Sequence, residues 1–288
     1  MIIKAFKSGI SKAWRYRRVV LVVYVTTLML ASLVALPFKG LLENKAGNSL
    51  IVSDLVKGFD YTFLNDFFQN YGEGFLPLWD QSILLVGFHF VFMIFLMGGI
   101  VKLVVVAPEK YDRLLFWGAS GQYFWRLFRT TVYFLIIHGL ILAFFVYLFL
   151  VITKGMSPEK LDSELIIVDT LKGLAPFYFF IGAFFFMWQD YTKIFIIEEN
   201  RRFTTRPTLN ALRFIMKNFR KSYGLYLLNI LLLVLLIIGN HFLSCFLFVD
   251  SLKGIILAFV LSQVFIIGRL VLKLTRLGSE ASLIKNKI

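Results

Sequence analysis

Three ionisable side chains stand inside long apolar segments of the sequence, where a charge is energetically costly. Asp190 is the only acidic residue within the six apolar segments described below, and Lys102 and Arg269 stand near the ends of two others. A charged residue at membrane depth usually faces a partner charge or a wet cavity. We therefore predict that Asp190 pairs first with Arg269 and second with Lys102. This charged cluster either packs the helices together or forms a site for an anionic headgroup or substrate.

Two short strings resemble motifs of membrane proteases but lack partners for catalysis. Gly118-Ala119-Ser120-Gly121 is similar to the GxSG string of rhomboid-type proteases, whose serine needs a histidine at the same depth. His241 is expected far from Ser120, and we interpret the glycines as a turn before the third apolar segment. Glu198-Glu199 resembles the EExxxR motif of CAAX-type proteases, but Phe203 replaces its arginine. The sequence therefore predicts no enzyme and no catalytic residue.

The histidines do not form a recognisable metal site. His89, His138 and His241 lie in three different apolar segments. His89 and His241 could share one layer, but two histidines without a third ligand are weak evidence for a metal. We favour hydrogen bonds between helices, with Asn240 or Ser244 as partners. Walker, CxxC and HExxH motifs are absent from the sequence. We expect no metal, no cofactor and no nucleic-acid partner.

The elements that carry these residues are predicted to be membrane-spanning helices. Of the 288 residues, 59% are hydrophobic, whereas an ordinary soluble domain has about 45–50%. Six apolar stretches are each about as long as the roughly 20 residues that a helix needs to cross a bilayer. They cover residues 19–37, 83–106, 131–152, 174–197, 224–249 and 254–274. We predict an all-α, polytopic membrane helix bundle that forms one transmembrane domain over residues 1–288.

The distribution of lysine and arginine predicts the orientation of this bundle. Of 31 such residues, 24 fall in the N-terminal segment, in residues 102–130 and 191–223, and after residue 268. Loops on the cytoplasmic side carry this excess of positive charge. Both termini are therefore expected in the cytoplasm, together with most of the net charge of +14.

Three helical hairpins are predicted, and each follows a basic amphipathic segment. In the first segment Ile3, Phe6, Ile10 and Trp14 recur at helical spacing. In the third, residues 203–222, an apolar face is expected opposite a basic one. The cations of that basic face are Arg213, Lys217, Arg220 and Lys221. Such a helix lies in the headgroup layer with its cations among lipid phosphates, so we expect anionic lipids to contact these four residues.

The largest loop on the opposite side covers residues 38–81 and is rich in aromatic residues. Asp60 is a plausible N-cap for a short helix that ends at Tyr71. The aromatic residues suit an interfacial belt, and a recognition surface is the alternative.

Two segments carry a resemblance to a known family. Gly121-Gln-Tyr-Phe-Trp-Arg126 precedes the third apolar segment, and Gln189-Asp-Tyr-Thr-Lys193 leads into a basic helix. Both are similar to motifs of an uncharacterised family of bacterial six-helix integral membrane proteins, and the likeness extends over most of the chain. The resemblance implies a six-helix bundle in the bacterial inner membrane and implies no activity.

The expected function is non-catalytic. We expect a membrane scaffold or accessory subunit that engages anionic lipid headgroups and partner proteins on the cytoplasmic face. A small transporter or permease component is the alternative, with the Asp190 cluster at its inner mouth. A cavity at the level of Asp190 would favour transport, and a closed apolar bundle would favour the scaffold.

Thiol labelling tests the orientation. In a Cys245→Ser background, a cysteine at Thr205 should resist an impermeant thiol reagent in intact cells, because residues 191–223 carry the strongest positive charge. Cysteines at Asn48 and Ser157 should react with it. Labelling of Thr205 from outside would reverse the predicted orientation.

Overall fold

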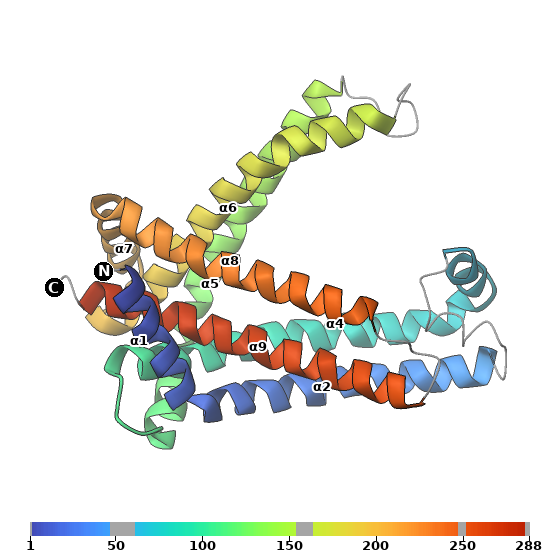
Figure 1. The fold of residues 1–288 in the computed structure, drawn as a ribbon, viewed down its shortest axis with the longest axis horizontal. Helices are drawn as coiled ribbons and strands as arrows, with labels where there is room; N and C mark the ends of the chain where they lie inside the picture. The colour runs from blue at the N-terminus through green and yellow to red at the C-terminus, as the bar shows by residue number, and fades with distance from the viewer. Residues whose placement is uncertain (1, 47–60, 154–163, 247–251, 286–288) are drawn as a thin grey trace.

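The structure is a computed structural model that describes residues 2–46, 61–153, 164–246 and 252–285. These residues form eight α helices and no strand (Figure 1). The helices are α1 (Ile2–Arg15), α2 (Arg17–Ala46), α4 (Tyr61–Val106), α5 (Arg113–Ile152), α6 (Glu164–Glu199), α7 (Thr205–Lys217), α8 (Phe219–Cys245) and α9 (Leu252–Lys285). The prediction of an all-α fold is confirmed.

Six of these helices are long and apolar enough to cross a membrane. They contain Arg17–Leu41, Leu76–Val106, Arg113–Ile152, Leu165–Glu199, Phe219–Cys245 and Lys253–Lys285. Each predicted segment falls within one of them, the fifth as far as Cys245, where the described part of α8 ends. The chain is therefore a multi-pass membrane protein.

The six long helices form two arms that meet at one end (Figure 1). α5 and α6 run together in one arm, while α2, α4, α8 and α9 run in the other, and both termini lie near the meeting point. Nearly all buried residues also lie there, in residues 94–105, 116–134, 183–197, 222–229 and 274–284 and in α1 and α7. We call this region the basic end. Among the described side chains of residues 230–246 and 253–273 none is buried, as expected for helices that face lipid.

A close crossing of α4 and α5 holds the basic end together. A Cβ atom added at Gly99 would lie 2.5 Å from the Phe116 carbonyl oxygen and 2.6 Å from Ser120 Oγ. The turn predicted at Gly118–Gly121 is wrong, because α5 runs through it without interruption. A glycine inside a helix is only about 1 kcal/mol less favourable than an alanine, and the packing of α5 against α4 outweighs that cost. Ser120 is fully buried and donates a hydrogen bond to the Phe116 carbonyl.

The short helices α1 and α7 each pack through one face and expose several large apolar residues on the other. α1 buries Ala5, Gly9, Lys12 and Ala13, and it packs against the end of α9. Trp14 on the opposite face of α1 is 71% exposed. α7 behaves in the same way, with Ala211 and Ile215 buried but Leu209, Met216 and the following Phe219 exposed. Most of each predicted apolar face is therefore free to contact lipid, whereas Phe6 of α1 packs partly against the core.

The region predicted as a loop over residues 38–81 is partly helical. α2 continues to Ala46, and α4 begins at Tyr61 and runs without a break into the membrane segment. The short helix expected to end at Tyr71 is thus the start of a longer helix. Asp60, its predicted N-cap, lies outside the described residues.

Substitution of the crossing glycine tests the packing of α4 on α5. Gly99→Ala should lower the free energy of unfolding by about 1–3 kcal/mol, because the new methyl group overpacks the contact with Phe116. Thermal unfolding in mild detergent measures this change. The matched control is Gly118→Ala, which meets open space and should be neutral or stabilising. Equal effects of the two variants would contradict the crossing.

Candidate functional site

The site is built around a buried carboxylate that joins the two arms. Asp190 on α6 is only 3% exposed. Its Oδ1 accepts a hydrogen bond from Lys193 Nζ at 2.9 Å, one turn along the same helix. Its Oδ2 lies 2.7 Å from an Nη of Arg276 on α9. Two cations therefore offset the cost of burying this charge, and the ion pair with Arg276 ties α6 to α9.

Asp190 is paired as predicted, but the predicted partners are wrong. Arg269 lies two turns from Arg276 on α9, and its guanidinium stands 5.7 Å from the ring of Phe265. Lys102 Nζ lies 5.7 Å from the ring of Tyr123 on α5. The prediction assumed that the sixth span ends near residue 274, whereas α9 continues to Lys285. The arginine at the depth of Asp190 is therefore two turns further along the helix.

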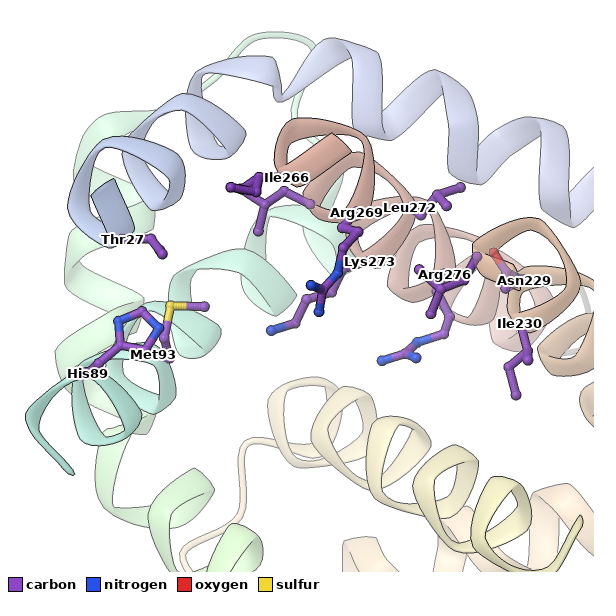
Figure 2. Close-up of a pocket in the computed structure, with 12 residues that line it drawn as sticks. Thr27, His89, Met93, Asn229, Ile230, Ile266, Arg269, Leu272, Lys273 and Arg276 are labelled. Carbon is purple, nitrogen blue, oxygen red and sulfur yellow. The ribbon is translucent and has the colours of Figure 1, made fainter. Parts of the chain in front are cut away.

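A cavity of about 510 Å³ lies beside this ion pair. Arg269, Lys273 and Arg276 project from one face of α9 toward it (Figure 2). The other walls come from α2, α4 and α8. Those helices contribute Thr27, His89, Met93, Asn229, Ile230 and Leu233, and α9 adds Ile266, Leu270 and Leu272 to its three cations. The cavity thus combines a row of positive charge with mostly apolar walls.

A second hollow of about 230 Å³ adjoins the first and is lined by α4, α5 and α6 together with Lys273 of α9. Met93 and Lys273 line both hollows. Gln189 and Lys193 of α6 line the second, so it reaches the helix that carries Asp190. Four cations, those of Arg269, Lys273, Arg276 and Lys193, line the two hollows, and two of them, Arg276 and Lys193, pair with Asp190. An anion is the ligand that this charge balance favours.

Other predicted site residues lie away from the cavity. Arg213 and Lys217 are exposed on α7, and Arg220 and Lys221 are exposed at the start of α8. The predicted continuous helix over residues 203–222 is broken at Asn218, which caps the end of α7. Trp188 Nε1 donates a hydrogen bond to the Thr208 carbonyl at 3.0 Å and anchors α7 on α6. These surface cations and the cavity are two separate basic features.

The histidines take separate positions. His89 lines the cavity, and the Nδ1 atom of His138 lies 2.6 Å from the carbonyl oxygen of Phe134. The predicted bond of His241 to another helix is wrong, because its Nε2 contacts Cys245 Sγ within α8 at 3.9 Å. In the part of the chain that the structure describes, no three His, Cys, Asp or Glu residues gather as metal ligands.

One buried lysine lies outside the membrane segments. Lys12 Nζ donates hydrogen bonds to Ser282 Oγ at 2.9 Å and to the Gly278 carbonyl at 3.5 Å. Burial, together with the charges of Lys285 and Arg15, lowers the pKa of Lys12 to about 8. Lys12 fastens α1 to the helix that carries the cavity cations.

No family model, curated protein or solved structure matches this chain. The assignment of a function therefore rests on the site itself.

Sequence reasoning missed Arg276 and Glu280 as site residues because it placed them in a cytoplasmic tail. Their spacing carried the signal. Arg269, Lys273, Arg276 and Glu280 follow one another at intervals of four, three and four residues, which places them on one face of a helix. Glu280 lies within the last membrane-spanning candidate, so Asp190 is not the only acid in such a segment.

A double-mutant cycle tests the ion pair. Asp190→Asn and Arg276→Gln should each lower the free energy of unfolding by about 3–5 kcal/mol, because each leaves a buried charge without its partner. The double variant should recover much of that loss. Thermal unfolding in mild detergent reports the three values.

The exposed pair of Asp169 and Lys172, whose side chains are both 73% exposed, provides the control. Its removal should change the free energy of unfolding by about 1 kcal/mol at most. Small, additive effects at Asp190 and Arg276 would show that the pair does not stabilise the fold.

Proposed function

We propose that this protein is a non-catalytic membrane protein of the bacterial inner membrane that binds an anionic phospholipid in its cavity. The observation that carries the proposal is the row of Arg269, Lys273 and Arg276 along one wall of an otherwise largely apolar cavity. A phospholipid supplies both matching parts, a negative phosphate and an apolar chain.

The position of the cations along α9 supports a headgroup as the ligand. The membrane candidate begins at Lys253, and Lys273 follows 20 residues later. At 1.5 Å per residue the two are about 30 Å apart, which equals the thickness of the hydrocarbon core. Lys273 is therefore expected at the boundary between hydrocarbon and headgroups. With the basic end in the cytoplasm, this is the inner leaflet.

The apolar walls support a lipid rather than a soluble anion. Ile266 and Arg276 are ten residues apart on α9, so the cavity extends about 15 Å along the helix. Met93, Leu233 and Ile266 contribute apolar surface along that length. A small soluble anion leaves such surface facing water, whereas the first part of an acyl chain covers it.

The surface of the basic end suits the same membrane face. Trp14 on α1 and Met216 on α7 are exposed beside basic residues, a combination typical of helices that lie in the headgroup layer. Arg213, Lys217, Arg220 and Lys221 are proposed to contact anionic headgroups there without a defined pocket. Partner proteins on this face belong to the same proposal.

Transport of an anionic substrate is the second candidate, and the cavity is the observation that favours it. A cavity at the depth of Asp190 is expected of a transporter and not of a closed scaffold. The six membrane-spanning candidates are continuous helices and lack the breaks that mark many transporter sites. We therefore place lipid binding first.

Lipid binding to the purified full-length protein tests the proposal. Labelled phosphatidylglycerol should bind saturably in mild detergent, and phosphatidylcholine should not. The double variant Arg269→Gln and Lys273→Gln should weaken this binding roughly 30-fold, because each cation contributes about 1 kcal/mol next to an anionic headgroup.

The matched control is the double variant Arg213→Gln and Lys217→Gln, which removes the same charge from α7 and should change saturable binding less than about threefold. Equal binding of the two lipids, or an unchanged affinity in the cavity variant, would contradict the proposal. Displacement of the lipid by soluble glycerol phosphate would instead favour transport.

A further inference from the structure

A second buried carboxylate follows the cavity cations on α9 and has no hydrogen-bond partner. Glu280 stands one turn beyond Arg276 on α9 and is 0% exposed. Neither of its carboxylate oxygens has a hydrogen-bond partner, and the same holds for Arg276 Nε. Glu280 is therefore the one carboxylate of the described site that no cation holds directly.

Burial without a partner favours the neutral form of Glu280. An ionised carboxylate that loses its water and gains no donor is strongly destabilised, and such a group takes up a proton instead. Asp190 has Arg276 and Lys193 within 3 Å and stays ionised. Two carboxylates in one site are thereby assigned different protonation states.

The charged and titratable groups that face Glu280 come from four helices. α6 contributes Asp190, Tyr191 and Lys193, and α8 contributes Tyr226. Arg276 belongs to α9 itself, and Lys12 of α1 bonds to the neighbouring turns at Gly278 and Ser282. Among these groups Arg276 is shared, because it pairs with Asp190 and still has an unpartnered Nε atom.

We propose that Glu280 carries a proton that couples the acidity of the basic end to anion binding in the cavity. Loss of this proton to water would leave a carboxylate that competes for Arg276, which lines the cavity. The net positive charge next to the ligand would fall by one unit. Anions therefore bind more tightly when Glu280 is protonated, and the coupling rests on the proposed lipid site.

Infrared spectroscopy of the full-length protein tests the proton without any ligand. The wild type at neutral pH should show the carbonyl band of a protonated carboxylic acid, and Glu280→Gln should remove it. Glu198→Gln, which changes an exposed carboxylate on α6, should leave the band unchanged.

The Glu280→Gln variant should also fold with wild-type stability, because glutamine and protonated glutamate match in charge and nearly in shape. A band that is absent from the wild type, a band that survives in Glu280→Gln, or a variant that does not fold would overturn the proposal.

Binding of labelled phosphatidylglycerol at different pH values tests the coupling. Its phosphodiester keeps one negative charge, so a change in affinity reports the protein. Wild-type affinity should fall roughly tenfold as the pH is raised until the carbonyl band of Glu280 disappears, as expected for one charge near the site. Lys12, whose pKa is about 8, loses its charge in both proteins, so Glu280→Gln should lack only the step that follows the carbonyl band. Glu198→Gln should behave as the wild type.

The outcomes separate the two proposals. Binding that does not change with pH in the wild type, or that changes equally in Glu280→Gln, would overturn the coupling and leave lipid binding intact. Absence of lipid binding at every pH would overturn the proposed function and with it the coupling.

Discussion

The contact between Asp190 and Arg276 is the interaction on which the rest of the basic end depends. Asp190 belongs to the arm of α5 and α6, and Arg276 belongs to the arm that contains α9. At the basic end the two arms share a core, and away from it they diverge (Figure 1). A buried carboxylate tolerates no drift in the position of its cation, so the pair fixes where α6 crosses α9.

The same pair explains why the cavity is positive. Asp190 neutralises part of the charge of Arg276 and Lys193. Arg269 and Lys273 have no carboxylate within ion-pair distance among the described residues, and both line the cavity. Such cations at membrane depth need a counter-charge or water. In the proposed function an anionic headgroup supplies the counter-charge, and the proton proposed on Glu280 prevents the protein from supplying it internally.

Hydrophobic length predicted the membrane helices well, because a bilayer imposes the same requirement on each of them. It predicted the ends of helices poorly. Residues 274–284 are buried by α1 and their neighbours, so α9 continues past the point where its apolar run ends. Tertiary packing of this kind is invisible in a hydropathy profile. The error moved the partner of Asp190 by two turns, from Arg269 to Arg276.

Residue spacing also did not predict which face of an amphipathic helix packs against the protein. The pattern around Trp14 correctly indicated a helix, yet the packed face of α1 is made of Ala5, Gly9 and Ala13. Small residues permit close approach between helices, whereas large exposed ones suit lipid. The periodic apolar residues therefore identified the helix but not whether protein or lipid covers its apolar face. Gly118 likewise suggested a turn where α5 is continuous.

Photo-crosslinking most directly tests whether an anionic lipid occupies the cavity. A phosphatidylglycerol that carries a photoreactive group near its headgroup should be incubated with the full-length protein in bilayers, and the labelled peptides should be mapped by mass spectrometry. If lipid occupies the cavity, adducts should form on α8 near Asn229 and Leu233 and on α9 between Ile266 and Arg276. Unlabelled phosphatidylglycerol should suppress them. Adducts confined to α7 and to the outward surfaces of the arms would show that lipid contacts only the surface.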